Sequence, residues 1–402
     1  MVRLPAQARP LFPYLKPAYT TMTRLVAPVT VQLSRWRGGY LPRTAVDTME
    51  QAAARGGRIS TVRPAEVVRR TPPADSPTPH PTFAANLAEA IPRVAIAELP
   101  NGRVLGPEGA VITGDGAIVQ ELSFYFGTTR PREHPLFWHP FPGPPRHVPG
   151  RLGVLASRGD RNYYHFLIDV MPRLAIAEQG GEIAPPDRWY VPAKPGFQRE
   201  LLGLAGLTED QWIDSTANPH VQADVLVVPG LPSNIVRNPP WVVGFLRRRL
   251  MPQPIARVPG RGVYITRGDA PNNRRVVNEA SVVAALRALG FSTADPATMT
   301  VREQIECFAS ASVIVAPHGA ALANLVFTSP GAAVVELFPA GYAKPDYWKL
   351  ANGVPGLAYH YLLGTGPVTA RQLAGFVVAD IEVDVAVLVD VVGGILDQQR
   401  DG

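Results

Sequence analysis

Three polar side chains recur at helical spacing in the stretch NYYHFLIDVMPRLAIAE, residues 162–178. If this stretch is one helix, His165, Asp169 and Arg173 share a face, because residues four apart are neighbours on a helix surface. A carboxylate beside an imidazole can orient the ring and support its action as a general base. The same carboxylate could instead bridge the histidine and the arginine and fasten the helix to its neighbours. Spacing alone leaves both interpretations open.

A second candidate lies in VIVAPHGAALANLVFTSPGAAVVELFP, residues 313–339. The apolar run 313–315 is typical of a buried parallel strand, and His318 and Gly319 follow its carboxyl end. The small residues from Ala320 can open a helix. Ligands of open parallel sheets bind beyond the carboxyl ends of the strands, where helix N-termini offer N–H groups to phosphates. The stretch therefore predicts an anion-binding loop, with a tight connection in which His318 caps the helix as the alternative.

Arginines gather in RGVYITRGDAPNNRRVVNE, residues 261–279, which predicts a strand over 263–266 and a helix from about residue 278. Arg267 falls at the end of that strand, and Arg274 and Arg275 fall in the following loop. The planar guanidinium suits phosphate because it donates two parallel hydrogen bonds and keeps its charge. We expect a diphosphate site here, with Arg274 and Arg275 also serving partly as solvated charges. Glu336, near the end of a later strand, could accept hydrogen bonds from ribose hydroxyls or pair with an arginine.

The elements that would position these residues read as an α/β protein. Strands and helices alternate over about 151–235 and again over about 260–365, and short strands with turn signals fill 94–126. Gly290 is expected to end one helix, and Thr300 with Glu303 predicts a capping box that begins the next. The second region has the β-α-β-α-β content of a nucleotide-binding half-sheet.

The N-terminal part has a different composition. Residues 64–82 are dense in proline and indicate an extended linker. The basic arm before it either lies on an anionic membrane surface or forms a solvated extension. We expect a poorly ordered arm and linker over 1–82, an N-terminal domain over 83–240, a C-terminal domain over 241–370, and a tail over 371–402 that packs back on the body. The basic residues of the arm all precede the first acidic residue, Asp47: Arg3, Arg9, Lys16, Arg24, Arg35, Arg37 and Arg43.

Composition narrows the class of protein. The 402 residues are 46% hydrophobic and 18% charged, which is enough for two ordinary domain cores. The single cysteine, Cys307, leaves no internal disulfide and reads as a core thiol. The net charge is +6, but no nucleic-acid-binding motif accompanies it, and no apolar run is long enough for a membrane helix. We find no Walker sequence, zinc motif, Gly-x-Ser-x-Gly elbow or Asp-x-Asp pair, so the cations of a phosphate site would come from the protein.

Three stretches together resemble glycosyltransferase family 61. They are NYYHFLIDVMPRL, then VYITRGDAPNNRRVVNE, then the continuous text from LGFSTADP to VVELFP, and the likeness covers roughly residues 94–365 in matching order. The resemblance implies a GT-B fold, two Rossmann-like domains facing a cleft, preceded here by a β-rich segment. It also implies inverting transfer from a nucleotide sugar without an obligatory metal or other cofactor. The donor-binding residues would be Arg267, Arg274, Arg275, His318, Gly319, Ala320, Asn324 and Glu336.

In such a displacement a base takes the proton of the acceptor hydroxyl while the nucleoside diphosphate leaves. Either His165 or Asp169 would be the base, and Asn162 and Arg173 would position the substrate. We expect a glycan or lipid-linked glycan acceptor, a role in capsular or exopolysaccharide biosynthesis, and a cytoplasmic location, with residues 1–46 as a peripheral contact at the inner membrane face. No nucleic-acid partner is expected. A nucleotide-sugar epimerase of GT-B architecture and a non-catalytic module that binds a sugar nucleotide or glycan remain alternatives.

Overall fold

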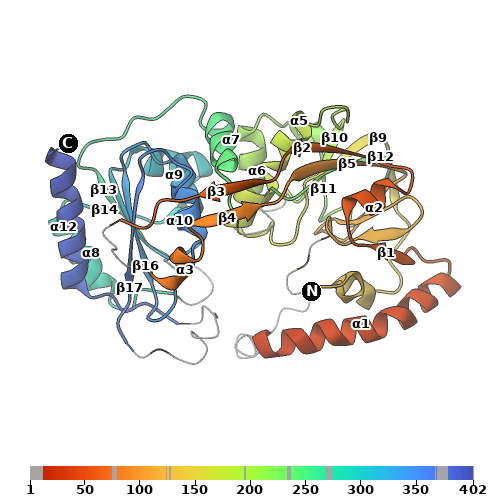
Figure 1. Cartoon of the computed structure of the whole chain (residues 1–402), viewed down its shortest axis with the longest axis horizontal. Helices are drawn as coiled ribbons and strands as arrows, with labels where there is room; N and C mark the ends of the chain where they lie inside the picture. Colours follow the sequence, from red (N-terminus) through yellow and green to blue (C-terminus); the bar gives the residue numbers. More distant parts are fainter. Residues whose placement is uncertain are drawn as a thin grey trace. The chain divides into compact units, whose positions relative to one another are not determined.

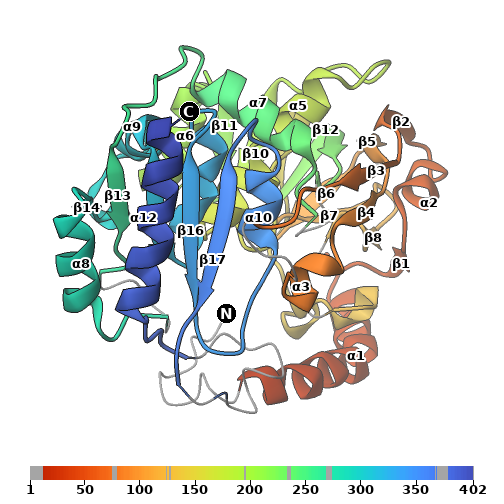
Figure 2. The same cartoon turned by 60° about the vertical axis from the view of Figure 1, so that its left-hand side comes forward.

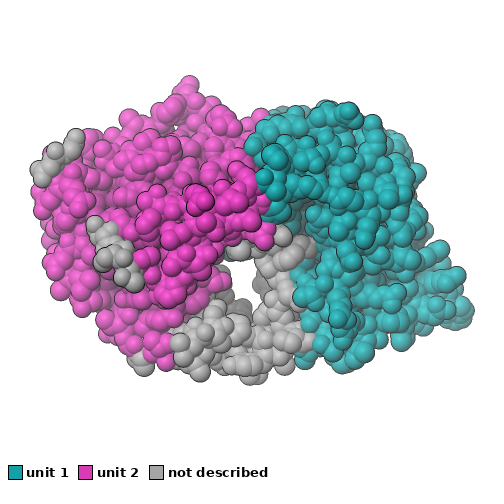
Figure 3. All heavy atoms as spheres, viewed as in Figure 1, with its two compact units in different colours: residues 1–65, 92–232 teal, residues 66–91, 233–402 magenta. Residues whose placement is uncertain are grey.

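The chain folds into two compact units. The computed structural model describes residues 12–74, 79–123, 125, 128–193, 196–232, 237–268, 274–366, 368 and 379–401, with the backbone alone for residues 12–17 and 401. Unit 1 comprises residues 1–65 and 92–232, and unit 2 comprises residues 66–91 and 233–402 (Figure 3). The boundary between the two α/β regions therefore falls at residue 232, ahead of the expected 240.

Unit 1 is built on a ten-stranded mixed sheet in which β12, β9, β10 and β11 are parallel neighbours. Shorter antiparallel strands extend it and form the β-rich segment that the sequence indicates before residue 126. Its elements are α1 (Phe12–Trp36), β1 (Thr44–Val46), α2 (Met49–Ala53), β2 (Arg58–Arg63), β5 (Val94–Pro100), β6 (Arg103–Leu105), β7 (Ala110–Ile112), β8 (Ala117–Val119), η2 (Pro131–Glu133), η3 (Pro135–Trp138), β9 (Arg146–Val154), α4 (Tyr163–His165), the π-helix η4 (Phe166–Val170), α5 (Arg173–Glu178), β10 (Arg188–Val191), α6 (Gly196–Leu204), η5 (Glu209–Gln211), β11 (Trp212–Asp214) and β12 (His220–Pro229).

The parallel part of this sheet determines the position of the segment that carries His165, Asp169 and Arg173. Leu152 and Val154 on β9, Tyr190 on β10 and Leu226 on β12 are fully buried in one core cluster. The chain leaves the carboxyl end of β9 and runs through α4, η4 and α5 before it returns in β10. Because β9 and β10 are parallel neighbours, the helical segment that carries His165 begins just beyond the carboxyl edge of the sheet.

Unit 2 contains a five-stranded, fully parallel sheet in the order β14-β13-β15-β16-β17. Numbered along the chain this order is 2-1-3-4-5, a doubly wound arrangement whose direction reverses between β13 and β15. Its elements are β3 (Glu66–Arg69), α3 (Pro81–Ala84), β4 (Ala88–Ile91), α7 (Pro240–Leu250), β13 (Gly262–Ile265), α8 (Glu279–Ala288), β14 (Ser292–Ala294), η6 (Pro296–Thr298), α9 (Val301–Ser310), β15 (Val313–Pro317), the 3₁₀-helix η7 (Ala320–Phe327), β16 (Ala333–Phe338), α10 (Asp346–Ala351), β17 (Ala358–Leu363) and α12 (Val385–Asp401).

Helices α8 and α12 cover one face of this sheet (Figure 2). Leu388, Val392 and Ile395 of α12 share a core with Val313 and Val315 of β15, so the C-terminal helix belongs to the hydrophobic core of unit 2. Several local predictions are confirmed. Gly290 ends the α8 segment with a positive φ, Thr300 and Glu303 form the capping box of α9, and Cys307 is a buried thiol.

The expectation of a poorly ordered arm over residues 1–82 is wrong for much of that range. Residues 12–36 form the helix α1, β1 pairs with β8, and β2 pairs with β5 in the sheet of unit 1 (Figure 1). Residues 66–91 belong instead to unit 2, where β3 and β4 form an antiparallel pair. Composition suggested a linker because proline-rich text lacks periodicity, but these extended segments gain their order from partners far along the chain.

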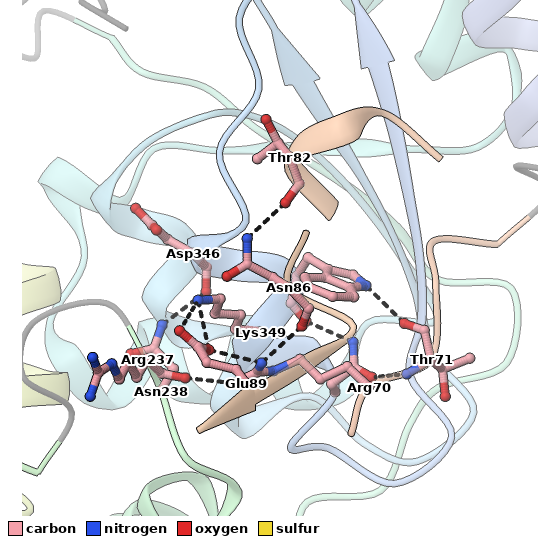
Figure 4. Close-up of polar contacts among 11 residues, drawn as sticks. Arg70, Thr71, Thr82, Asn86, Glu89, Arg237, Asn238, Asp346 and Lys349 are labelled. Atoms are coloured by element: carbon pink, nitrogen blue, oxygen red, sulfur yellow. Dashed lines mark hydrogen bonds and ion pairs between the residues drawn. The ribbon is translucent and has the colours of Figure 1, made fainter. Parts of the chain in front are cut away.

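A buried polar network holds residues 66–91 on unit 2 (Figure 4). Arg70 and Lys349 both form ion pairs with Glu89, at 2.9 Å and 2.8 Å, and Arg70 also donates to the carbonyl of Arg237. Nearby, the ring of Phe83 contacts the ring of Trp348. Burial lowers the pKa of both Arg70 and Lys349, while the Glu89 carboxylate opposes that shift, so the two cations depend on this one acid.

Among the residues that the structure describes, no helix combines the length and the apolar character that crossing a membrane requires.

Candidate active site

The second and third sequence candidates meet at the carboxyl edge of the sheet of unit 2. Arg267 follows β13 and His318 follows β15, and these strands are hydrogen-bonded neighbours on either side of the reversal in strand order. Nη1 of Arg267 donates to the carbonyl oxygen of His318 at 3.2 Å. A reversal point is where a doubly wound sheet binds its ligand, because the connections on its two sides diverge to opposite faces.

His318 is held from behind by a carboxyl group. Its Nδ1 lies 2.5 Å from Oε1 of Glu336 on the adjacent strand β16, and the hydroxyl of Tyr359 on β17 donates to the other oxygen, also at 2.5 Å. Glu336 is fully buried. The N-cap of η7 is Gly319, with no side-chain capping bond, so the alternative in which His318 caps the helix is wrong.

The surroundings of this pair determine where its hydrogens lie. The imidazole stacks on Phe338 and meets the edge of Tyr347, with ring centroids 5.1 Å away in both cases. Burial lowers the pKa of His318 well below its usual value, and the cationic Arg274, Lys344 and Arg267 lower it further. Burial likewise raises the pKa of Glu336. A neutral carboxyl group then donates to Nδ1, and the remaining ring hydrogen sits on Nε2 as a donor.

The arginines form a cationic group beside this histidine. Burial and, to a smaller extent, the neighbouring charge of Arg274 lower the pKa of Arg267 to about 10, so Arg267 stays protonated at neutral pH. Nε of Arg267 and Nε of Arg274 are buried and find no hydrogen-bond partner among the described residues. Arg274 has a φ of 83°, a strained conformation for a residue with a side chain, and its backbone N–H donates to Asp380. Buried guanidinium donors without partners fit a site for an anion.

Gly319 lets the guanidinium group of Arg267 lie close to the backbone. A Cβ atom at residue 319 would overlap Nη1 of that arginine, so the absence of a side chain lets the guanidinium lie against the backbone. Ala320, the first residue of η7, is half-buried beside it. The small-residue turn therefore makes room for the cation.

Two of the predicted donor-binding residues need correction. Both oxygens of Glu336 are engaged by His318 and Tyr359 and none of its surface is exposed, so the expected contact with a ribose does not fit. Asn324 is also fully buried and donates to Oε1 of Gln304 at 3.0 Å, which joins η7 to α9. Both residues support the loop from behind instead of reaching a ligand.

The first candidate group lies in unit 1. Nδ1 of His165 lies 2.7 Å from Oδ2 of Asp169, which is the expected contact between residues four apart. The His165 side chain keeps 21% of its surface exposed, whereas Asp169 keeps 3%. Asn162 is the N-cap of this segment, and its side chain accepts a hydrogen bond from the N–H of Tyr164 at 3.0 Å. A buried carboxylate therefore orients a partly exposed imidazole.

The segment is not the single regular helix that its periodicity predicts. Residues 166–170 form a π-helix, and Met171 donates to the carbonyl of Phe166, five residues back. Pro172 has no N–H to continue the α-helical pattern, so α5 starts afresh after it. π-Helical turns occur often at functional sites, because they re-aim side chains that a regular helix would place elsewhere.

Arg173 is buried, and its side chain does not fit the predicted substrate-positioning role. It is 2% exposed, and its guanidinium donates to the carbonyls of Leu155, Ala156 and Pro229 near the ends of β9 and β12. Burial lowers its pKa to about 9, and the charge of Asp169 opposes the shift. Arg173 thus fastens the helical segment to the sheet edge.

Several polar residues of both groups carry no signal in the local sequence. Tyr347 and Tyr359 touch the His318–Glu336 pair, but nothing in their local sequence distinguishes them from core tyrosines. Asp160 precedes the His165 segment and is buried, and burial raises its pKa to about 7. Asp380 accepts hydrogen bonds from the backbone N–H groups of Arg274 and Arg275, although it lies more than a hundred residues further along the chain. The side chain of Arg275 is exposed.

A metal site is not evident in the described part of the chain, where no three histidine, cysteine, aspartate or glutamate side chains gather closely enough to hold an ion. The groups available for an anion are the arginines and His318.

The chain is similar to known proteins over part of its length. Residues 163–335, from α4 to β16, match the glycosyltransferase 61 family model. Similar proteins include protein O-linked-mannose beta-1,4-N-acetylglucosaminyltransferase 2 of Tetraodon nigroviridis, 33% identical over 106 residues, and the protein of that name from Bos taurus, 37% identical over 110 residues. In each case the alignment covers 25% of this chain and 18% of the relative, so the chain spans less than a fifth of these relatives.

Proposed function

We propose that this protein is an inverting glycosyltransferase that transfers a sugar from a nucleotide-sugar donor to a glycan acceptor. The observation that carries the proposal is that the buried Nε atoms of Arg267 and Arg274 find no hydrogen-bond partner among the described residues, beside the reversal point of a parallel sheet. A nucleoside diphosphate supplies the negative charge and the acceptor oxygens that such donors match.

The donor diphosphate would be bound in unit 2. Arg267 and Arg274 would donate to its oxygens, Nε2 of His318 would supply a neutral donor, and the exposed Arg275 would add charge at the rim. Gly319 and Ala320 would let the phosphates approach the backbone. These groups would stabilise the charge that develops as the nucleoside diphosphate leaves, which is the main electrostatic demand of the reaction.

We propose His165 as the general base. Its imidazole is the more exposed member of the His165–Asp169 pair, so it can reach an acceptor hydroxyl that the buried carboxylate cannot. The carboxylate would fix the ring orientation and stabilise the imidazolium that forms on proton uptake. Asn162 and Arg173 would act indirectly, as the cap and the anchor of the segment.

The arrangement of the whole enzyme is part of the proposal. The GT-B architecture that the resemblance implies would assign donor binding to unit 2 and acceptor activation to unit 1. The parallel, doubly wound sheet of unit 2 supports its half of this assignment. We propose that no metal or other cofactor is needed, because protein cations take the place of a divalent ion at the diphosphate.

We propose a class of donor sugar and a class of acceptor. The names of the similar proteins describe N-acetylglucosaminyl transfer to O-linked mannose, so we propose a hexose-type sugar, with N-acetylglucosamine as the first donor to try. A glycan or lipid-linked glycan of a capsule or exopolysaccharide is the proposed acceptor, made in the cytoplasm at the inner membrane face, with residues 1–46 as the membrane contact.

Incubation of the full chain with a panel of nucleotide sugars and mixed glycan acceptors tests the proposal. Release of nucleoside diphosphate together with a new glycosidic product is the expected result. Isomerisation of the donor without transfer would favour a nucleotide-sugar epimerase. Binding without any turnover would favour a non-catalytic sugar-nucleotide or glycan-binding module.

A further inference from the structure

Helix α1 of unit 1 buries its polar side. Thr23, Ala27, Thr30 and Ser34 recur every three or four residues, and all four are buried against the body of the unit. These are small side chains, three of them with hydroxyl groups, and the hydroxyls of Thr23 and Thr30 donate to backbone carbonyls within the helix. The face that a surface helix normally buries is its apolar one, so the arrangement in α1 is reversed.

The opposite side of α1 is a stripe of large apolar residues that faces solvent. Leu25 is 63% exposed, Val29 60% and Trp36 78%. The stripe also follows the helical period of three or four residues, which puts its members on one continuous face of the helix. Its members are Met22, Leu25, Val29, Leu33 and Trp36.

Specific contacts fix the rotation of α1 about its axis. Nε1 of Trp138 in η3 donates to the hydroxyl of Thr23 at 2.5 Å, and the ring of Tyr19 stacks on the same indole with centroids 5.8 Å apart. On the flank, Arg24 lies 4.0 Å from Glu133 of η2. Ala27 enters a core cluster that includes Leu136 and Phe137. The inward face is therefore built into unit 1, and the apolar stripe cannot turn inward without breaking these contacts.

The charge around the stripe indicates what it meets. Residues 1–46 contain seven arginine and lysine residues and no aspartate or glutamate. Arg35, Arg37 and Arg43 are exposed at or just beyond the end of α1. A second copy of the chain would bring the same cations together, since a symmetric dimer juxtaposes like surfaces. An anionic bilayer offers opposite charge together with an apolar interior, and both features match.

We infer that α1 lies in the surface of an anionic phospholipid bilayer, with its apolar stripe inserted at the level of the acyl chains and its arginines among the headgroups. The polar face of α1 then packs on the rest of unit 1, and the opposite face lies in lipid. The expectation of a solvated, poorly ordered N-terminal extension is replaced by an ordered helix that anchors the protein peripherally. The inference does not depend on the proposed transferase activity.

Vesicle co-sedimentation of the full chain tests this. Binding is expected to vesicles of equal parts phosphatidylcholine and phosphatidylglycerol, and much less to phosphatidylcholine alone. The double variant Leu25→Glu/Val29→Glu should lower the partition coefficient more than about tenfold, because two apolar side chains lose their burial. The matched control is Val258→Glu/Val387→Glu in unit 2, which changes two exposed valines and lowers the net charge equally, and should bind nearly as the parent does.

A second measurement avoids added charge. Brominated acyl chains quench a nearby indole, so tryptophan fluorescence should fall on binding, and the fall should be smaller in Trp36→Phe. Equal loss of binding in both glutamate pairs would overturn the inference, as would equal binding to neutral vesicles. So would the absence of binding, or a dimer in solution that Leu25→Glu/Val29→Glu dissociates, since the stripe would then contact a second copy. Thermal melting of each variant establishes that it is folded.

Discussion

Nδ1 of His318 lies 2.5 Å from Oε1 of Glu336: His318 directly follows β15, and Glu336 lies on the neighbouring parallel strand β16. Tyr359 donates to the second oxygen of the same carboxyl group. Because burial raises the pKa of Glu336 and lowers that of His318, the proton between them belongs to the carboxyl group, and Nε2 of the ring bears a hydrogen. The pair can therefore present a neutral donor to a phosphate without adding a buried charge.

Nucleoside diphosphate affinity should fall as the pH rises through the raised pKa of Glu336. Below that pKa the carboxyl group donates to Nδ1 and Nε2 carries its hydrogen. Above that pKa the carboxylate accepts a hydrogen bond from Nδ1–H, so the single ring hydrogen is on Nδ1. Nε2 then has no hydrogen and cannot donate a hydrogen bond to a phosphate oxygen. Calorimetric titration over a pH series measures the slope.

The variant Glu336→Gln provides the control for this effect. Its amide N–H can donate to Nδ1 and its oxygen can accept from Tyr359, so the side chain imitates the protonated acid at every pH. Its affinity should show a shallower pH dependence than that of the parent. An identical slope in both proteins would assign the pH dependence to the ligand or to another group.

Replacing Arg267 by alanine should weaken nucleoside diphosphate binding by about 1.5–3 kcal/mol, the range for hydrogen bonds to charged groups. Arg287→Ala, which removes an exposed arginine from the last turn of α8, is the control and should bind as the parent does. Unchanged affinity in a folded Arg267→Ala protein would show that the diphosphate lies elsewhere.

Adding a single methyl group at residue 319 should also weaken donor binding. In Gly319→Ala the new Cβ would overlap Nη1 of Arg267 and displace the guanidinium, while the extended backbone at residue 319 suits alanine. Donor affinity should drop with little change in melting temperature. Combined with Arg267→Ala the substitution should cost almost nothing more, because the group that it displaces is already absent. Additive losses in the double variant would mean that alanine acts on the loop directly.

The catalytic role of His165 is tested by turnover and stability together. His165→Ala should lower turnover by about 10²–10⁴-fold, the usual contribution of a general base, with donor affinity nearly unchanged. Asp169→Asn should be damaging as well, because the imidazole loses the carboxylate that orients it. If Asp169 were itself the base, its variant would be inactive while His165→Ala retained partial activity.

A purely structural role for His165 and Asp169, in which their contact only holds the helical segment in place, predicts a different result. Both variants would then lose melting temperature and activity together, since the contact between His165 and Asp169 would serve only to hold the segment. Arg173→Ala is the comparison for that behaviour. It removes hydrogen bonds to three buried carbonyls and should destabilise unit 1 strongly. Full turnover in well-folded His165 and Asp169 variants would remove this segment from the mechanism.

Activity should survive excess EDTA. The chain has no Asp-x-Asp pair, and Arg267, Arg274 and His318 can supply the donors that a divalent ion would otherwise provide at the diphosphate. Turnover with EDTA is compared with turnover after added manganese or magnesium. Loss of activity on chelation, restored by either ion, would point to a carboxylate metal site and contradict the proposal.

The sequence alone indicated the elements of unit 2 well, because the signals there are local. Val313–Pro317 and Ala333–Phe338 are strands, and the capping box at Thr300 begins a helix as expected. Apolar runs and caps depend on neighbours within a few residues. Family resemblance then identified the segments around His165, Arg267 and His318, since short motifs retain their order whatever the surrounding chain does.

Local patterns failed where partners lie far away in the chain. Residues 64–82 read as a linker, yet Nε1 of Trp348 donates to the carbonyl of Thr71, and that hydrogen bond joins segments 277 positions apart. The outward apolar stripe of α1 has the periodicity of a helix, but periodicity does not state which face packs on the body. Tertiary contacts decide that, among them the hydrogen bond from Trp138 to Thr23 and the burial of Ala27 against Leu136 and Phe137.

By itself the sequence determined the residue types available for chemistry, many of their strands and helices, and a resemblance to one family over part of the chain. The tertiary structure decided which of these side chains are buried, which are exposed and which contact one another. Arg173 shared a periodic face with His165 but turns inward, because the π-helix and Pro172 shift its direction toward the carbonyls at the strand ends. Glu336 lies near the carboxyl end of β16, and its side chain contacts His318. This contact follows from the parallel pairing of β15 and β16, which brings the carboxyl ends of the two strands side by side. The burial and the direction of a side chain depend on packing between segments far apart in the chain, so they cannot be predicted from a short stretch of sequence.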